Sequence, residues 1–301
     1  MTINSPITPE QIRKSADMLK QTRPAYKYLI DFYEEMFVIQ EESKSELDLD
    51  PIIIGQEQIK LKIDKGISLI NPDQFVIDVN HAKKLLIKIC SIAGQKLPHL
   101  LDASQNISAG LSNNSFNAET LFNALLKNDP KALNKIAQTI NVNEDALIFF
   151  AFEAIAPSIQ ACSSQLSYYL KSDSEAKPSQ EQVPWKKGTC PVCGNIPQMG
   201  ILNQDGEKYL VCSLCLHRWK TSRMGCSLCQ NREKDKQQYF FNEEEKEYRV
   251  ALCDNCKKYI KIVDLRELVR AFYPPLEQLC SIHLDMQASE QGYQGLVQNK
   301  I

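Results

Sequence analysis

The chain has 301 residues, a formal net charge of −2 and an apolar fraction of 43%, which are ordinary values for a globular protein of about two domains. This near-neutral balance argues against a dedicated nucleic-acid binder, which carries a marked basic excess. The N-terminus shows no secretory signal, and no run approaches the roughly 18 apolar residues of a membrane span. We therefore expect a cytoplasmic protein without a membrane span, whose thiols stay reduced.

The first 170 residues are predicted to form one all-helical domain. Thr8 and Gln11 have the spacing of a capping box, and Pro9 occupies the first helical position. Apolar residues at helical spacing predict further helices over about 24–37, 81–93, 117–127 and 130–140, whereas 52–54 are expected to be a loop. A long apolar helix from about 143 to 170 is expected to kink or break near Pro157. The polar segment that follows predicts a linker at 171–186.

Eight of the eleven cysteines then fall into four Cys-x-x-Cys pairs. Two such turns supply the four sulfurs that zinc or iron accepts in a tetrahedral site, and the sequence does not choose between these metals. The segments between the first and second pairs and between the third and fourth pairs are each long enough for a hairpin. We expect two metal ions, the first bound by Cys190, Cys193, Cys212 and Cys215 and the second by Cys226, Cys229, Cys253 and Cys256.

Other arrangements of these cysteines stay open. The first pair could share its metal with the third, and disulfides or a dithiol redox motif are the non-metal alternatives. Neighbouring pairs in a chain without a secretory signal favour metal. In the first turn, Pro191 presets the backbone and Gly194 can adopt the left-handed conformation. His217 follows the second pair but is expected to be solvated or to support a ligand, since both sites already have four sulfurs.

The expected fold class is α+β, with an all-helical N-terminal domain, two rubredoxin-like or zinc-ribbon four-cysteine modules and a C-terminal helix. Alternating apolar residues predict strands at 199–202, 209–211, 238–241, 248–251 and 259–263, and a helix follows at about 276–287. The predicted division is a helical bundle at 1–170, a linker at 171–186, ribbons at 187–222 and 223–265, and a C-terminal helix with its tail at 266–301.

The C-terminal third resembles the formate dehydrogenase accessory protein family, FdhE, over about residues 188–295. The resemblance lies in the four cysteine pairs with their flanking residues, in Trp219 and Arg223, and in a C-terminal His283-Leu284-Asp285 followed by Glu290 and Tyr293. It implies a cytoplasmic maturation factor for molybdenum- or tungsten-dependent formate dehydrogenases. It also implies rubredoxin-like metal centres that engage the catalytic subunit. The charged loop 232–236 departs from the family pattern and leaves the client enzyme open.

Three functions are compatible with these residues. The first is a metal-containing chaperone and not an enzyme, because no catalytic triad, phosphate loop or isolated carboxylate pair is visible. The second is a nucleic-acid-binding zinc ribbon protein, for which Arg218, Lys220 and Arg223, with Trp219 among them, offer a small basic and aromatic patch. The third is a rubredoxin-like redox protein, which needs iron.

The client-binding surface is predicted at two places. Arg218, Trp219 and Lys220 form one, because Trp and Arg are frequent interface anchors, although Trp219 could equally pack on the first metal site. His283 and Asp285 form the other, which follows from the resemblance. These two residues are two apart on a helix and therefore point to different sides, and the alternative is that each anchors the helix by hydrogen bonds.

Overall fold

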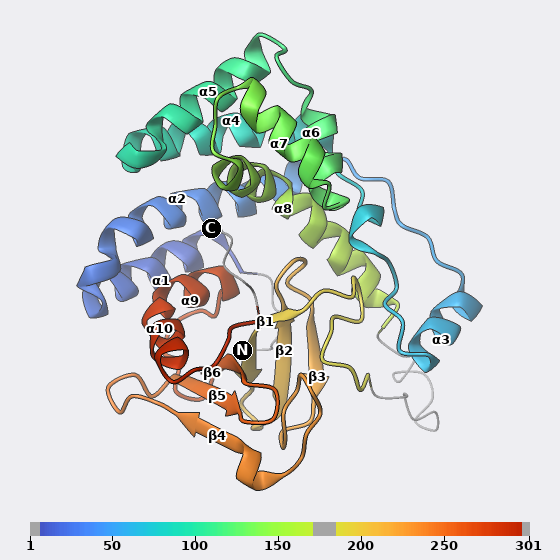
Figure 1. The fold of residues 1–301 in the computed structure, drawn as a ribbon, viewed down its shortest axis with the longest axis vertical. Coiled ribbons are helices and arrows are strands. Elements are labelled where there is room, and N and C mark those ends of the chain that lie inside the picture. The colour runs from blue at the N-terminus through green and yellow to red at the C-terminus, as the bar shows by residue number, and fades with distance from the viewer. Residues whose placement is uncertain (1–6, 171–184, 297–301) are drawn as a thin grey trace. The chain divides into compact units, whose positions relative to one another are not determined.

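The computed structural model describes residues 7–170 and 185–296, so most of the predicted linker lies outside the described residues. Its described helices and strands follow each other along the chain as in Figure 1. The helices are α1 Pro9–Thr22, α2 Lys27–Ser43, α3 Gln56–Asp64, α4 Val79–Lys96, α5 Leu101–Ser112, α6 Ala118–Leu126, α7 Pro130–Thr139, α8 Glu144–Tyr168, α9 Pro274–Cys280 and α10 Ile282–Glu290. The strands are β1 Pro197–Leu202, β2 Lys208–Cys212, β3 Arg218–Thr221, β4 Gln237–Phe240, β5 Tyr248–Cys253 and β6 Lys258–Asp264.

The chain packs as two compact units. One unit contains Thr8–Ile52 and Pro72–Cys162, and the other contains Ile53–Asn71 and Ser163–Gln298. The predicted α+β class is confirmed, because a helical N-terminal half is followed by a sheet, which carries two four-cysteine clusters, and by C-terminal helices. The predicted domain boundaries stay a prediction.

The helical unit begins as its sequence indicates. The Thr8 hydroxyl accepts a hydrogen bond from the Gln11 backbone N–H, and the Gln11 side chain accepts one from the Thr8 N–H, which completes the capping box. Aromatic and aliphatic side chains of α2, α4 and α8 are fully buried. Burial of such side chains contributes about 1.5–3 kcal/mol each.

Helix α8 continues through Pro157, so the helix does not break there; a kink, the other expected outcome, stays a prediction. Proline has no N–H, so it leaves the carbonyl of Glu153, four residues earlier, without its helical donor. The side-chain amide of Gln40 in α2 donates to this carbonyl at 2.8 Å and to the Glu153 carboxylate at 2.8 Å. Gln40 is itself buried. A side chain from a neighbouring helix thus replaces the missing backbone hydrogen bond, and α8 continues.

Among the described helices, α8 is also the one long and apolar enough to cross a membrane. Of its most apolar stretch, 67% is buried inside the protein. Such burial is typical of a core helix.

The six strands form one sheet in the order β3-β2-β1-β6-β5-β4. The two predicted hairpins are therefore not separate sheets: β1 pairs parallel with β6, with Gly200 opposite Ile262 and Leu202 opposite Asp264. The neighbouring strands on either side are antiparallel. The five predicted strands are present, and β3 is an additional edge strand beside β2 (Figure 1).

Both faces of the sheet carry buried side chains. On one face, residues such as Met199, Val211 and Val263 form a core with Leu284 and Ala288 of α10. We call this the α10 face. The opposite face carries the cross-strand neighbours Leu210 and Trp219, both buried, together with Ile262. Side chains alternate along strands, so Lys208 and Gly200 lie on this second face as well.

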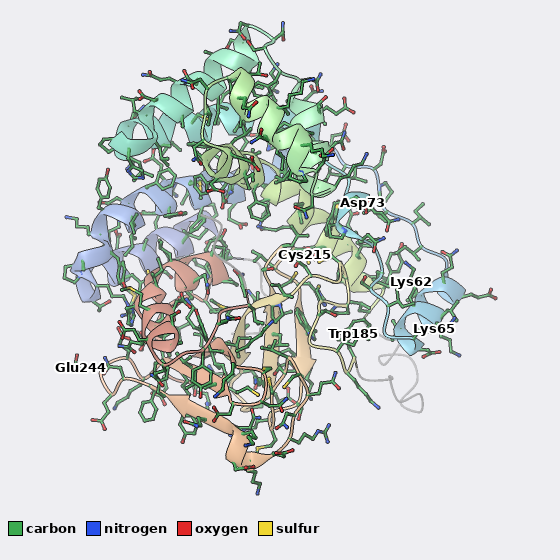
Figure 2. All side chains as sticks on the ribbon, viewed as in Figure 1. Lys62, Lys65, Asp73, Trp185, Cys215 and Glu244 are labelled. Atoms are coloured by element: carbon green, nitrogen blue, oxygen red, sulfur yellow. The ribbon has the colours of Figure 1, made fainter. Side chains whose placement is uncertain are left out.

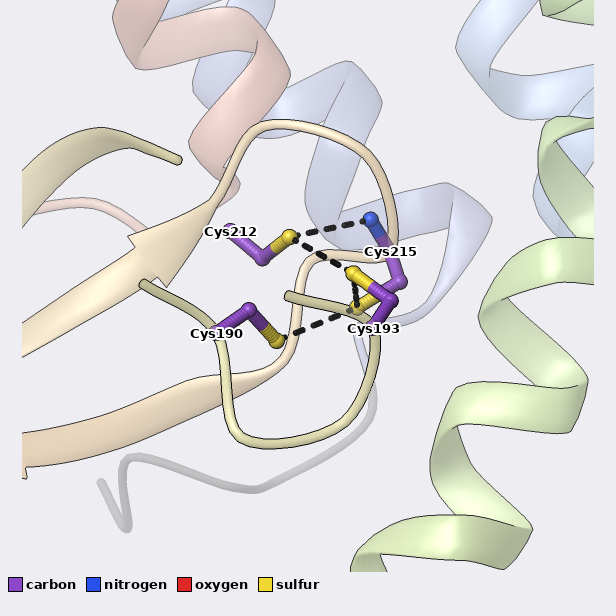
Figure 3. A group of neighbouring side chains, drawn as sticks. All are labelled: Cys190, Cys193, Cys212 and Cys215. Carbon is purple, nitrogen blue, oxygen red and sulfur yellow. Dashed lines mark hydrogen bonds between the residues drawn. The ribbon is translucent and has the colours of Figure 1, made fainter. Parts of the chain in front are cut away.

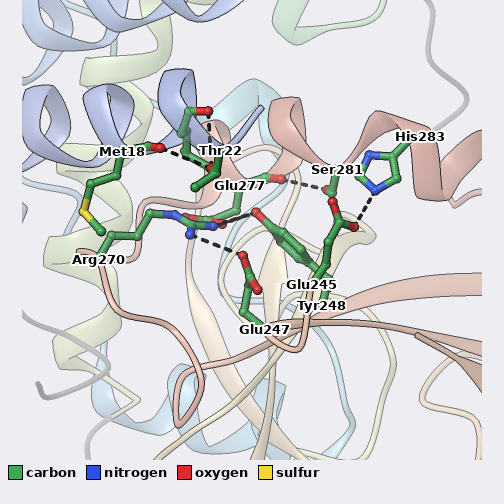
Figure 4. A network of polar contacts seen from close by, with 10 residues as sticks. Met18, Thr22, Glu245, Glu247, Tyr248, Arg270, Glu277, Ser281 and His283 are labelled. Carbon is green, nitrogen blue, oxygen red and sulfur yellow. Dashed lines mark hydrogen bonds and ion pairs between the residues drawn. The ribbon is translucent and has the colours of Figure 1, made fainter. Parts of the chain in front are cut away.

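The expected C-terminal helix is two helices, α9 and α10, which are separated at Ser281. A buried polar network fixes α9 to β5 (Figure 4). Arg270 Nη2 donates to Glu277 Oε2 at 2.7 Å and to Tyr248 Oη at 2.8 Å, and Tyr248 donates to the same carboxylate. The fully buried Glu277 therefore has a cation and a hydroxyl as partners, which offsets the loss of its hydration.

Candidate metal centres

The four Cys-x-x-Cys turns share one backbone conformation. In each, the residue after the second cysteine has a positive φ: Gly194 (76°), Leu216 (56°), Gln230 (60°) and Lys257 (53°). In three of the turns, the N–H of this residue bonds the carbonyl of the first cysteine. This closure brings the two sulfurs of each pair to the same side. The left-handed position predicted for Gly194 is present, and three residues with side chains adopt the same conformation.

The first centre joins the turn before β1 with the turn between β2 and β3 (Figure 3). Its four sulfurs all lie within 4.8 Å of one another and belong to Cys190, Cys193, Cys212 and Cys215. The Sγ atoms of Cys193 are 3.5 Å from Cys212 and 3.6 Å from Cys215, and Cys190 and Cys215 are 3.7 Å apart. The backbone N–H groups of Leu214 and Cys215 donate to the Cys212 sulfur. The four cysteines are buried.

Segments distant in sequence hold the first turn in place. The N–H groups of Leu69 and Ile70 donate to the carbonyls of Pro191 and Val192 at 2.9 Å. Lys62 of α3 donates to the Leu69 carbonyl at 2.6 Å, and Trp185 Nε1 donates to the Thr189 carbonyl just before Cys190. Figure 2 labels the side chains of Lys62 and Trp185. These contacts explain why residues 53–71, with the unpredicted helix α3, pack with the sheet.

The last turns of α8 reach the other side of this centre. Ser167 Oγ lies 2.7 Å from His217 Nδ1, and Ser163 bonds the Cys215 thiol. Burial raises the pKa of Cys215, but the hydrogen bonds from the neighbouring thiols and Ser163 outweigh it and hold this pKa well below its usual value. For Cys190 and Cys212, burial and the crowded sulfurs raise the pKa. A cation bound by the four sulfurs would stabilise their thiolate forms.

The second centre joins the turn after β3 with the turn between β5 and β6 and is more open. Its sulfurs, from Cys226, Cys229, Cys253 and Cys256, also lie within 4.8 Å of one another. Cys226 and Cys256 are 3.8 Å apart, and Cys229 and Cys253 are 3.7 Å apart. Cys253 is buried and Cys229 is exposed. The first Cys-x-x-Cys turn therefore shares its site with the second, and the third shares its site with the fourth. The alternative, in which the first and third turns share a metal, is not found among these eight cysteines.

Polar groups donate to the sulfurs of this centre. The Leu228 N–H bonds Cys226, the Asn255 amide bonds Cys229, and the Gln237 amide bonds Cys253, with donor–sulfur distances of 3.4–3.6 Å. Burial raises the pKa of Cys229, but bonds from Asn231, Asn255 and the neighbouring thiols lower it to about 7. Donors to sulfur spread the thiolate charge and favour the metal-bound form.

Both donor sets fit a tetrahedral metal. With metal–sulfur bonds of about 2.3 Å, the edges of a sulfur tetrahedron measure about 3.8 Å. The shorter distances, 3.5–3.8 Å, match this edge and are far longer than a disulfide bond of about 2.05 Å. All eight are free thiols. Two four-cysteine groups that can bind metal ions are therefore present, and four thiolates accept zinc or iron alike.

The other predicted site residues are placed as follows. Trp219 is buried and its ring stacks on the half-buried His217, so Trp219 does not offer a free surface. Burial lowers the pKa of the Arg218 guanidinium, which lies 5.0 Å from the Phe272 ring centroid. Lys220 is exposed and ion-paired with Glu207. His217 is not one of the four candidate ligands of the first centre. Its ring is hydrogen-bonded to Ser167 beside that centre.

His283 and Asp285 point to different partners. His283 Nε2 lies 2.7 Å from Glu245 Oε2 (Figure 4). Asp285 pairs with the buried Lys261 at 2.7 Å and accepts a hydrogen bond from Tyr259. Both side chains thus have structural contacts. Whether either one also contacts a client stays a prediction.

Sequence reasoning did not find the residues that support the sulfurs from a distance. These are Ser163 and Ser167 at the end of α8, the backbone of residues 69–70, and the amides of Gln237 and Asn255. Asn255 lies between Cys253 and Cys256 and could have been suspected from its position. The others are distant in sequence or carry no motif, so no local pattern indicated them.

Comparisons with known proteins identify relatives of this arrangement. The family model described as the FdhE central domain matches residues 189–223. A protein FdhE homolog of Aquifex aeolicus is 32% identical over 156 residues, which are 50% of each chain. Protein FdhE of Escherichia coli K12 is 31% identical over 108 residues, which are 35% of this chain and 34% of that protein. The matched part therefore spans half or less of the length of these curated relatives.

The predicted resemblance to the FdhE family is confirmed. The segment that matches the FdhE central domain contains the complete first centre and β3. The crystal structure of the FdhE protein from Pseudomonas aeruginosa has a TM-score of 0.56 at 19% identity, and the match covers 97% of this chain and 95% of that one. At this identity, the likeness to that FdhE structure shows a shared fold over nearly the whole chain.

Proposed function

We propose that this chain is a metal-binding maturation factor, a chaperone that binds the catalytic subunit of a molybdenum or tungsten formate dehydrogenase. It assists the activation or assembly of that subunit in the cytoplasm and catalyses no reaction itself. The observation that carries the proposal is the presence of two complete four-cysteine sets on one sheet in a chain that resembles FdhE.

The eight cysteines would hold two metal ions, zinc or iron. A closed four-thiolate site leaves no open coordination position for a substrate, so its contribution is to cross-link the turns. Cys190 and Cys193 precede β1 and Cys212 and Cys215 separate β2 from β3, so one ion ties three strands together. The second ion would tie the turn after β3 to the β5–β6 turn. The two ions then fix the sheet as a rigid docking element.

The basic and aromatic patch gives little support to nucleic-acid binding. A binder needs free cations on one continuous face. Arg218 lies over Phe272, Trp219 is buried, and Lys220 is neutralised by Glu207. Lys220, which is already paired, and Arg223 are then the exposed cations of this patch, and two cations do not make a continuous basic face. Of the three residues predicted here to bind a client, Lys220 is the one that it can reach.

A rubredoxin-like redox role is the second candidate, and the second centre is the observation in its favour. Its Cys229 is exposed, and the Cys229 sulfur accepts a hydrogen bond from the Asn255 amide. Solvent exposure and N–H···S hydrogen bonds both influence the reduction potential of an iron–sulfur site. The role requires iron in at least one centre. Protein purified without oxygen that contains only zinc in both centres excludes it.

His283 and Asp285 provide a test of the proposed client surface. Asp285→Ala leaves the Lys261 ammonium buried without its carboxylate, so we expect a loss of about 3 kcal/mol in the free energy of unfolding. His283→Ala removes a more exposed pair and is expected to change this free energy by less than about 1 kcal/mol. Client binding is then measured for His283→Ala. Full binding by this stable variant places the client surface elsewhere.

The proposed function is tested by affinity capture of the tagged chain from its native cell. We expect the catalytic subunit of a formate dehydrogenase in the captured fraction, and less of its activity in cells that lack the chain. The metal-deficient variant is Cys226→Ser/Cys229→Ser, which removes two candidate ligands of the second centre. Its control is Cys90→Ser, because Cys90 is a buried thiol of the helical unit and belongs to neither centre. Capture of no such subunit, together with unchanged formate dehydrogenase activity, contradicts the proposal.

A further inference from the structure

Strand β4 is an open edge of the sheet. In the part of the chain that the structure describes, β4 pairs with β5 alone and ends the strand order. The Asp254 N–H donates to the Lys236 carbonyl just before β4, and hydrogen-bonded positions alternate along an antiparallel pair. Gln238 is therefore the next residue bonded to β5, whereas the N–H and carbonyl groups of Tyr239 point away from β5. An edge of this kind can pair with one more strand.

Two aromatic side chains are exposed along this edge. Tyr239 is 67% and Phe241 is 51% exposed, and their rings stack with centroids 6.3 Å apart and an interplanar angle of 17°. Phe240, between them in sequence, packs against the core of the α10 face. The two rings therefore lie on the other face, where Tyr239 is opposite Ala251 of β5. Adjacent exposed rings of this size are typical of a surface that binds a partner.

The second centre lies on the same face as the two rings. The side-chain amide of Gln237, two residues before Tyr239, donates to the Cys253 sulfur at 3.6 Å. Cys229 of this centre is exposed. A segment bound along β4 would therefore extend from the second centre past both rings to the loop at 242–247.

The loop at 242–247 is acidic, with four glutamates and one lysine. Two of the glutamates are bonded to His283 and Arg270. The other two, Glu243 and Glu244, are exposed and have no ion pair among the described residues. Arginine matches both parts of this surface, because its planar guanidinium stacks on aromatic rings and binds carboxylates through paired hydrogen bonds.

We propose that β4 is the docking edge for the client, and that an extended, arginine-bearing segment of the catalytic subunit adds to the sheet beside it. The inference rests on the proposed function. Main-chain hydrogen bonds to the outward groups of β4 hold the segment. Its arginine stacks on Tyr239 and Phe241 and pairs with Glu243 or Glu244, which selects this segment over others.

The first measurement is the affinity of the full chain for the purified catalytic subunit. Tyr239→Ser/Phe241→Ser removes both rings, and the control Met286→Ser removes another exposed apolar side chain of the same unit. We expect the dissociation constant to rise at least about tenfold in the double variant and to stay at the parent value in the control. Both proteins should unfold at the parent temperature, since the removed side chains are exposed.

The second measurement isolates the charge. Glu243→Gln/Glu244→Gln is compared with Glu233→Gln/Asp235→Asn, which removes two exposed carboxylates at the other end of β4. The first variant is expected to bind the client more weakly and with less dependence on salt, and the second to keep the parent behaviour. Salt dependence equal to that of the parent in Glu243→Gln/Glu244→Gln overturns the role of arginine.

The third measurement tests the pairing of strands. Tyr239→Pro removes an outward N–H and leaves the bonds to β5, so it should bind more weakly than Tyr239→Ser. Equal affinities of these two variants exclude an added strand. With p-benzoylphenylalanine in place of Phe241, photo-crosslinking and mass spectrometry identify the bound segment. A crosslinked segment without an arginine contradicts the inference.

The outcomes separate this inference from the proposed function. A parent chain that binds the catalytic subunit no better than Tyr239→Ser/Phe241→Ser does overturns the docking edge and leaves the proposed function standing. So does a dimeric parent that becomes monomeric in this variant, because the edge then belongs to a second copy of the chain. A parent chain that binds no catalytic subunit refutes the proposed function and the inference together.

Discussion

The four residues that follow the cysteine pairs set the shape of both centres. Each has a positive φ, and only one of them is glycine. A residue with a Cβ in this conformation loses roughly 1–2 kcal/mol relative to its ordinary backbone regions. The turns keep the conformation because the closing hydrogen bond and, with metal bound, two sulfur–metal bonds both require it.

A substitution at Gln230 measures this backbone strain. Its side chain bonds the Lys186 carbonyl, and both alanine and glycine remove that bond. Gln230→Gly is therefore expected to be about 1 kcal/mol more stable than Gln230→Ala, because glycine adopts a φ of 60° without a Cβ clash. Chemical denaturation of the two metal-loaded variants gives the difference. Equal stabilities show that the backbone at residue 230 can leave this conformation without destabilising the turn.

Sequence patterns predicted the metal-binding residues because each ligand pair is local. Cys190 and Cys193 are three apart, and the same spacing recurs in all four turns, so the motif is visible without a fold. Gln237 and Ser163 act on sulfurs of residues far along the chain. Such residues become visible only when the register of the sheet is known.

At the scale of single elements, α8 shows why a proline need not end a helix. Pro157 removes one backbone donor, and Gln40 from α2 replaces it. Sequence rules count the missing N–H but not a donor 113 residues away in the chain. The rules also missed β3, a four-residue edge strand that pairs with β2, and the nine-residue helix α3. At Ser281, a side-chain bond to the Glu277 carbonyl marks the junction between α9 and α10.

A double-mutant cycle between Gln40 and Pro157 tests the replacement of the backbone donor. Gln40→Met is expected to lower the free energy of unfolding by about 2 kcal/mol, since it leaves the buried Glu153 carbonyl without a donor. In a Pro157→Ala background, the alanine N–H supplies the helical bond, and the loss should shrink by about 1 kcal/mol. Urea denaturation of the four proteins gives the coupling. Additive losses mean that Gln40 acts through the Glu153 carboxylate alone.

For the whole molecule, the two centres differ in their exposure to solvent. The first is enclosed by the sheet, residues 69–70 and the end of α8, whereas the second exposes Cys229. The sequence predicted two consecutive ribbons of the same kind, and the cysteine spacing carries no information on what covers each pair. The joining of both hairpins through β1 and β6 was also invisible, since a parallel pair leaves no local pattern.

This difference predicts the order in which the centres lose metal. A chelator needs access to a sulfur or the ion, so the second centre should release its metal first, in a phase at least about tenfold faster. Native mass spectrometry during exposure to a chelator follows the two-metal, one-metal and metal-free species. The one-metal species should accumulate. In this species residues 189–223, which contain the first centre, should resist proteolytic cleavage. Simultaneous loss of both ions indicates that the sheet opens as a unit.

The most direct test of the account is the metal content of the protein purified without oxygen. We expect two ions per chain, and one ion in each of the variants Cys190→Ser/Cys193→Ser and Cys226→Ser/Cys229→Ser. Elemental analysis combined with native mass spectrometry gives both numbers. One ion per chain in the parent protein, or none with the eight thiols oxidised to disulfides, contradicts the assignment of two four-thiolate centres.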